Sequence, residues 1–122
     1  MNILIVDDDP HTRGMLFQLL HGMGHEVSVL ANGHNAVSLL ADPQHGVDLV
    51  FLDLEMPRLT GDKVIEVIKD IVQVHFVIVT GNSTPKLPNH IQIIEKPFDL
   101  SAIEQVVYER EKDLRAKMAK VR

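Results

Sequence analysis

Short runs of apolar residues alternate along this chain with longer segments whose apolar residues recur at helical spacing. The first run is Ile3-Leu4-Ile5-Val6, which ends abruptly at three aspartates and a proline. A continuous apolar run of this length, rich in β-branched residues, is typical of a strand that is buried on both faces. The same pattern predicts strands at 3–6, 26–30, 47–52, 76–80 and 91–95.

The segments between these runs have the periodicity of amphipathic helices. Asp9 can cap a first helix that has Pro10 at its first position, because Pro needs no hydrogen-bond acceptor there. Gly22 and Gly24 are expected to end that helix. Further helices are predicted at 35–40, at 61–71 and from residue 100 onward.

Strands that alternate with helices at this spacing favour an α/β fold, in which helices cover both faces of a doubly wound parallel sheet. We expect a flavodoxin-like arrangement of five strands in the order 2-1-3-4-5, counted along the chain. Ligands of such sheets bind beyond the carboxyl ends of the strands. Residues that directly follow a strand are therefore the first candidates for function.

Composition narrows the possibilities. A chain of 122 residues with 45% hydrophobic content suits one domain with one core, and the lack of cysteine excludes disulfides and cysteine-based zinc sites. No apolar stretch approaches the roughly 18 residues that a membrane-spanning helix needs, and no basic segment precedes the first strand. We therefore expect a soluble, cytoplasmic protein that makes no contact with membranes.

The charge is unevenly distributed. The net charge is −5, yet residues 109–122 contain six basic and three acidic residues and carry +3, which leaves −8 on residues 1–108. An acidic body repels the phosphates of nucleic acid, so we expect no direct binding to it. The change in composition also predicts a domain at 1–108 followed by a basic extension of the last helix at 109–122.

Polar and charged residues follow four of the predicted strands. Asp7-Asp8-Asp9 follows the first strand, Asp53 closes the third, Thr80 ends the fourth and Lys96 follows the fifth. Carboxylates that meet at one edge would repel one another unless a cation lay among them, and Mg²⁺ prefers such oxygen ligands. A lysine and a hydroxyl opposite the cation would stabilise an oxyanion. This arrangement suits phosphoryl transfer to a carboxylate.

The residues around these positions also resemble a known family. The blocks at 3–10, 51–61 (FLDLEMPRLTG), 77–81 (VIVTG) and 95–98 (EKPF) are similar to the receiver domains of response regulators. The resemblance implies that Asp53 is the phosphoacceptor and that Thr80 and Lys96 grip the phosphoryl group. For Mg²⁺ it implies a direct ligand in Asp8, a contact through water from Asp7, the backbone carbonyl of Glu55, and Asp53 itself.

Two further blocks resemble parts of the receiver pocket. Met56-Pro57 with Gly61 resembles the turn that shapes the pocket floor. Lys96-Pro97 resembles a peptide bond that is cis in this family, and a cis bond is plausible only because proline follows. Asp9 is assigned to capping because the resemblance places the metal ligands one and two positions earlier.

The sequence also departs from the family. The segment from 81 to 95 is about six residues shorter than is usual, and it contains Pro85 and Pro88, which block a helix interior. We therefore predict that the fourth helix is reduced or absent, as in a branch of single-domain receivers with a similar Thr-Gly block. Ile93 stands where many receivers have an aromatic residue that moves with Thr80.

The implied function is that of a response regulator in a two-component phosphorelay. A sensor histidine kinase or a phosphotransfer domain would donate a phosphoryl group to Asp53, and a conformational change near Thr80 would alter partner binding. We expect no enzymatic activity beyond self-phosphorylation and slow autodephosphorylation.

Other hypotheses stay open. A phosphatase of the haloacid-dehalogenase type also uses an aspartate with Mg²⁺, but its Asp-x-Asp motif has Glu55 in second place here. An interaction module that takes no phosphate is the other alternative. His21 and His25 have helical spacing for a metal, but Gly22 and Gly24 between them argue against a helix there.

The last helix is predicted to run beyond the domain, from near Asp99 or Ser101 to about Lys120. We expect Leu100, Ile103 and Val107 to pack on the sheet and the later apolar residues Leu114, Met118 and Val121 to be uncovered. A seven-residue spacing that suits a helix pair joins Leu100, Val107, Leu114 and Val121, but Arg110 and Lys117 occupy the intervening core positions. A weak homodimer or docking onto a downstream effector is expected through this helix.

Overall fold

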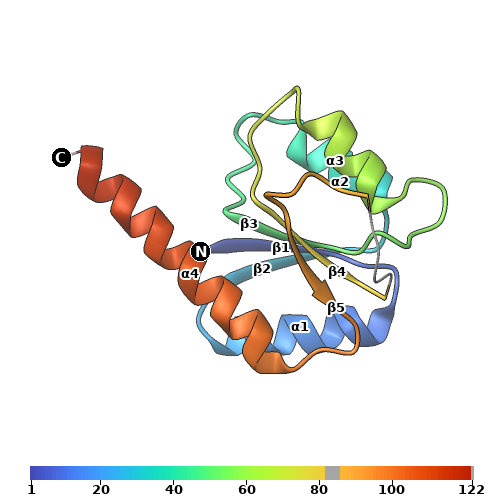
Figure 1. Ribbon diagram of the computed structural model, residues 1–122, viewed down its shortest axis with the longest axis horizontal. Helices are drawn as coiled ribbons and strands as arrows, with labels where there is room; N and C mark the ends of the chain where they lie inside the picture. The colour runs from blue at the N-terminus through green and yellow to red at the C-terminus, as the bar shows by residue number, and fades with distance from the viewer. Residues whose placement is uncertain (82–85, 122) are drawn as a thin grey trace.

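The computed structural model describes residues 1–81 and 86–121, which form an α/β sandwich (Figure 1). In chain order the elements are β1 (Asn2–Val6), α1 (Pro10–Gly22), β2 (Glu26–Leu30), α2 (Gly33–Leu40), β3 (Leu49–Leu52), α3 (Gly61–Ile68), β4 (Phe76–Thr80), β5 (Gln92–Glu95) and α4 (Leu100–Val121). No helix in these two stretches is both long and apolar enough to cross a membrane.

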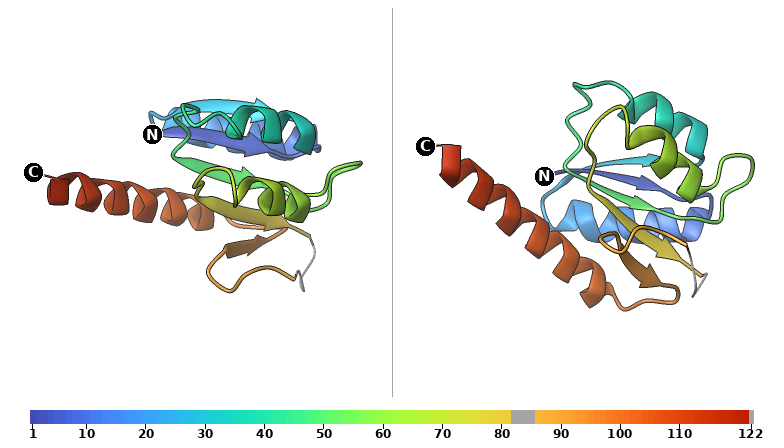
Figure 2. Two further views of the ribbon diagram at one scale, coloured as in Figure 1. Left: turned by 90° about the horizontal axis from the view of Figure 1, so that it is seen from above. Right: turned by 45° about the horizontal axis from the view of Figure 1, so that its top comes forward.

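The strands form one parallel sheet in the order β2-β1-β3-β4-β5, which confirms the predicted flavodoxin-like topology. Helices α1 and α4 cover one face of the sheet, and α2 and α3 cover the other (Figures 1 and 2). Alternate strand residues supply the two cores: Ile3 and Phe51 face α1 and α4, whereas Leu4 and Leu52 face α2 and α3. Both faces are buried, as a continuous apolar strand pattern requires.

Side-chain caps set the starts of the first two helices. The Asp9 carboxylate accepts hydrogen bonds from the His11 amide (3.1 Å) and the Thr12 hydroxyl (2.9 Å), which confirms its capping role. Helix α2 begins at Gly33, two residues before the predicted start, because Asn32 accepts a hydrogen bond from the Asn35 amide. This second cap was not recognised in the sequence.

Two other boundaries differ from the sequence prediction by two or three residues. Helix α3 ends at Ile68 rather than at 71, because the amides of Ile71 and Val72 both donate to the Ile68 carbonyl and close the last turn. Ile71 is exposed and has no core face to extend. Strand β3 begins at Leu49 rather than 47, since its ladder with β1 starts at the pair Ile3 and Leu49.

The connection between β4 and β5 lacks a helix in its described part, residues 86–91, as predicted. Pro85, on which that prediction also rested, lies outside the described residues. Leu87 and Ile91 pack as a loop against the core beneath α2 and α3. Because Ile94 faces the opposite core, alternation along β5 turns Ile93 toward the uncovered side, where it is 37% exposed.

Helix α4 is a single helix of 22 residues, and its second half projects beyond the sheet (Figures 1 and 2). Ile103 and Val107 are buried, but the expectation that Leu100 packs on the sheet was wrong: it is 41% exposed. Leu100 is the first residue of the helix, beyond the end of the edge strand β5, where little covers it. Leu114 is half-buried, and Met118 is 68% exposed.

A pair of substitutions tests where the packed part of α4 ends. Ile103→Ala removes a fully buried side chain and should destabilise the protein by about 2–4 kcal/mol, whereas Met118→Ala should change the free energy of unfolding by less than about 0.5 kcal/mol. Urea denaturation of both variants measures the difference. A loss for Met118→Ala comparable to that for Ile103→Ala would show that the projecting half is covered in solution.

Candidate functional site

The residues singled out at the ends of the strands lie together at the carboxyl edge of the sheet. Asp7 follows β1, Asp53 follows β3, Thr80 is the last residue of β4, and Lys96 follows β5. The Lys96 ammonium lies 2.9 Å from Asp7 Oδ2 and 3.4 Å from Asp53 Oδ2. One cation from the last strand thus bridges two carboxylates from distant parts of the chain.

Three carboxylates form a possible cation site here. Ligand oxygens of Asp7, Asp8 and Asp53 lie within 4.8 Å of one another. Asp7 and Asp53 are buried, whereas Asp8 is exposed. An all-oxygen set that is open to solvent on one side suits a hard divalent ion that keeps several of its waters.

Backbone contacts orient the two buried acids. The Asp9 amide donates to Asp7 Oδ1 (2.9 Å), and the Glu55 amide donates to Asp53 Oδ1 (3.1 Å). Each buried aspartate therefore has one oxygen held by an amide, and its other oxygen contacts Lys96. The Glu55 side chain is exposed. The role of its carbonyl as a metal ligand stays a prediction.

Arg13 is a site residue that sequence reasoning missed. Its guanidinium Nη1 donates to the backbone carbonyl of Asp7 at 2.8 Å and so braces the acidic loop from α1. The available signal was its position four residues after the capping Asp9, one helical turn away, from which a long basic side chain can reach back over the helix start.

Asp53 ionises at a higher pH than an ordinary aspartate, because its surroundings raise its pKa. Burial raises the pKa of Asp53 to about 6, and the charge of Asp7 adds to this, against the opposing effects of the Glu55 amide and Lys96. Burial alone would lower the pKa of Lys96, but the hydrogen bond and charge of Asp7 and the charge of Asp53 raise it overall. Lys96 is therefore charged at neutral pH.

Two structural features that the sequence predicted are confirmed. The Lys96-Pro97 peptide bond is cis. The turn after β3 passes so close to Asp53 that a Cβ at Gly61 would lie 2.3 Å from the Asp53 carbonyl oxygen, which only glycine permits. Arg58 in the same turn has a φ of 70°, a left-handed conformation.

Thr80 is buried at the carboxyl end of β4, and it pairs with Glu95 of β5 in the sheet. The Lys96 amide donates a hydrogen bond of 2.8 Å to the Thr80 carbonyl, which fixes the position of Lys96 relative to Thr80. The neighbouring aliphatic Ile93 pairs with Ile78. The aliphatic side chain that the sequence places here, where many receivers have an aromatic one, is exposed.

Fold and site together define a doubly wound α/β domain with a cluster of three carboxylates and a lysine at the carboxyl edge of its sheet. The family model described as "Response regulator receiver domain" matches residues 3–108, and this chain belongs to that family.

Named relatives agree with this assignment. The chain is 35% identical over 81 residues to the DNA-binding response regulator MtrA of Mycolicibacterium smegmatis, covering 66% of this chain and 35% of MtrA. It is 40% identical over 73 residues to the transcriptional regulatory protein CpxR of Klebsiella pneumoniae, covering 60% of this chain and 29% of CpxR. The chain thus spans about a third of the length of these curated relatives.

A solved structure shows the same fold. The response regulator TrrA from Thermotoga maritima, in complex with Mg(2+)-BeF, is 27% identical to this chain and superposes with a TM-score of 0.76. The match covers 89% of this chain and 97% of TrrA.

The raised pKa of Asp53 predicts a pH-dependent effect of neutralising it. The pKa of Asp53 is about 6 in the folded protein and 3.8 ordinarily. Protonation of Asp53 therefore stabilises the native state fully below pH 3.8, and this contribution is lost as the pH rises through 6. In EDTA, Asp53→Asn should therefore unfold at higher urea concentration than wild type at pH 7.5, by a margin that shrinks toward pH 4.

Asp62→Asn, which neutralises an exposed carboxylate on α3, is the matched control and should show no such margin. A stability difference between Asp53→Asn and wild type that stays constant from pH 4 to 7.5 would contradict the raised pKa.

Proposed function

We propose that this chain receives a phosphoryl group on Asp53 from a phosphohistidine of a sensor histidine kinase or a phosphotransfer domain. A carboxylate oxygen of Asp53 attacks phosphorus, the phosphorus–nitrogen bond to the imidazole breaks, and the histidine leaves with the electron pair. The observation that carries the proposal is the Lys96 ammonium, which contacts Asp53 Oδ2 and is positioned to stabilise negative charge on the incoming group.

The other site residues have matching roles in this proposal. Asp7, Asp8, Asp53 and the Glu55 carbonyl would hold Mg²⁺, and the three carboxylates that the structure groups together suit that ion. Bound there, Mg²⁺ would neutralise charge on the phosphoryl oxygens. Thr80 would donate its hydroxyl to a phosphoryl oxygen, and the phosphorylated state would reposition the segments around it.

We further propose that the chain acts as a signalling domain rather than as an enzyme with a separate substrate, and that it works in the cytoplasm. The haloacid-dehalogenase alternative is not supported, because the matching family is that of receivers. The domain would comprise residues 1–108, where the family match also ends, and residues 109–122 would form its basic extension.

The tail of α4 is the proposed contact for a partner. Met118 is exposed on a helix segment that projects from the domain, and six basic residues follow residue 108. We propose a weak homodimer or docking onto a downstream effector through this segment. The net charge of +3 on residues 109–122 favours a partner surface of opposite charge.

Phosphate uptake tests the main proposal. Wild type incubated with Mg²⁺ and acetyl phosphate should gain one phosphoryl group by mass spectrometry, and Asp53→Asn should gain none because it lacks the nucleophile at nearly constant volume. Asp62→Asn, an exposed acid outside the cluster, should behave as wild type. Rapid release of phosphate without a held label would indicate a phosphatase, and no uptake by wild type an interaction module.

The metal role of Asp8 is tested by a neighbouring pair of variants. Asp8→Asn removes one charge from the cation site and should weaken Mg²⁺ binding about tenfold or more, together with phosphorylation. Asp9→Asn should retain the helix cap and bind Mg²⁺ nearly as wild type does. Calorimetry gives both affinities. Equal Mg²⁺ affinity in Asp8→Asn and wild type would remove Asp8 from the ligand set.

The tail proposal is tested by deleting residues 114–122. Sedimentation of the full chain, with and without phosphorylation, should show association that the deletion abolishes. Monomeric sedimentation of the full chain in both states would rule out the homodimer, and unchanged kinase-dependent phosphorylation after the deletion would show that the tail is not needed for phosphate uptake.

A further inference from the structure

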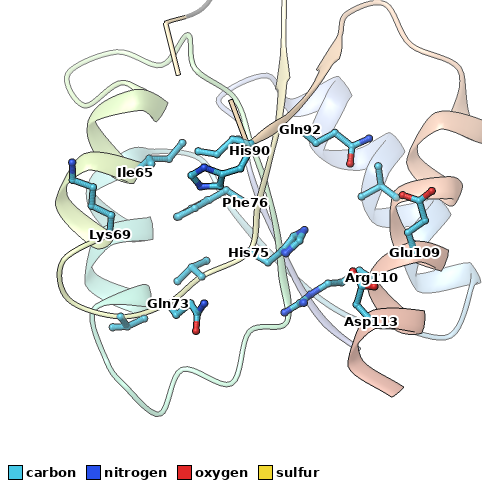
Figure 3. A pocket seen from close by; sticks show the side chains of 14 residues that line it. Ile65, Lys69, Gln73, His75, Phe76, His90, Gln92, Glu109, Arg110 and Asp113 are labelled. Atoms are coloured by element: carbon cyan, nitrogen blue, oxygen red, sulfur yellow. The ribbon is translucent and has the colours of Figure 1, made fainter. Parts of the chain in front are cut away.

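A hollow of about 360 Å³ lies at the amino edge of the sheet, at the opposite end of β4 from the phosphoacceptor (Figure 3). It is bounded by α3, by the starts of β4 and β5 and by the middle of α4. Ile65, Phe76, Ile91 and Val106 form its apolar wall. This volume lies at the lower end of the range of pockets that hold small molecules, which begins at roughly 300 Å³.

A cation without a carboxylate partner lies at the rim of this hollow. Arg110 of α4 donates from Nε to the carbonyl of Asp48 at 2.8 Å, which holds the half-buried guanidinium in place. Within residues 1–81 and 86–121, Arg110 makes no ion pair, and neither do Lys69 and Lys117. An oriented guanidinium presents its remaining N–H groups in the planar geometry that suits a carboxylate or a phosphate.

A second cationic side chain, Lys117, lines a hollow that adjoins Arg110. A second hollow of about 150 Å³ adjoins the first, shares His75 and Arg110 with it, and is also lined by Lys117. Two acids lie on the rim: the Glu109 carboxylate accepts a hydrogen bond from Gln105, and Asp113 is exposed on α4. Neither acid is in ion-pair contact with Arg110, so the guanidinium can pair with an anionic ligand.

His75 adds a neutral polar group beside this cation. Partial desolvation of its ring and the charge of Arg110 lower its pKa, Asp113 opposes this, and Lys117 lowers it further. A neutral imidazole at pH 7 can donate one hydrogen bond without adding charge next to the apolar wall. Figure 3 shows the His75 ring and the Arg110 guanidinium on neighbouring parts of the rim.

We propose that this hollow binds a small organic anion, in which a carboxylate or a phosphate monoester is attached to an apolar body of about one ring. Arg110 holds the anionic group with help from Lys117, and Phe76, Ile91 and Val106 contact the apolar body. A wholly apolar ligand would leave the guanidinium desolvated and unpaired, and a simple inorganic anion would leave the apolar wall unused.

Titrations of the full-length chain followed by ¹H–¹⁵N NMR test this site, with phenyl phosphate and benzoate as probes. At least one should bind saturably and shift the amides of His75 and Gln92, and the tighter of the two identifies the anionic group. Benzyl alcohol, a neutral probe of similar shape, should bind about tenfold more weakly or worse. Titrations of Asp53→Asn in EDTA should give the same affinities, which separates this site from the phosphoacceptor.

Variants on α4 assign the binding to the proposed residues. Arg110→Gln should weaken binding of the anionic probe about tenfold, and Arg115→Gln, an exposed charge five residues further along α4, should leave it unchanged. Because Arg110 also anchors α4 to Asp48, Lys117→Gln serves as a second variant that preserves this anchor and should weaken binding about twofold or threefold. Equal binding of benzyl alcohol, unchanged affinity in Arg110→Gln, or no saturable shift with either anion would overturn the proposal.

Discussion

The contact of the Lys96 ammonium with Asp7 and Asp53 is the interaction on which the rest of the site depends. Lys96 and Asp7 are 89 positions apart in the sequence, and both reach the site only because β1 and β5 run parallel within one sheet. Two buried carboxylates at one edge would repel each other without a nearby cation. Burial dominates the pKa of Asp53, and Lys96 only partly compensates for it. The negative charge of the carboxylates is therefore only partly compensated, so the site suits a further cation together with an anion.

The sheet explains how much of this could be predicted from the sequence. Four of the five strands end at a polar or charged residue, so the positions of Asp53, Thr80 and Lys96 at one edge follow from the local pattern and the regular geometry of a parallel sheet. The cap at Asp9 could be predicted for the same reason, because the cap and its proline are adjacent. These features depend on neighbours in the sequence or on the regular geometry of parallel strands.

What could not be predicted depends on packing between distant segments. Arg13 donates to the Asp7 carbonyl, and Arg110 donates to the Asp48 carbonyl, 62 positions away in the sequence. Both acceptors are backbone groups, which no pattern of side chains predicts. Leu100 fits the apolar periodicity of its helix but starts it beyond the edge of the sheet, so periodicity overestimates its burial. The hollow beside β4 likewise depends on how α3, α4 and the starts of β4 and β5 pack together, which no local pattern specifies.

The connection between β4 and β5 bears on which elements would carry a signal away from Asp53 in the proposed function. In the described part of that connection no helix covers β5, and Ile93 is open to solvent. Helix α4 begins four residues after Lys96, is packed on the sheet through Ile103 and Val107, and is held at the opposite edge by Arg110. Its 22 residues correspond to a rod of about 33 Å. In the proposed function, a small tilt of α4 at its start near Lys96 would displace its projecting end, and α4 would link the acidic site to a partner.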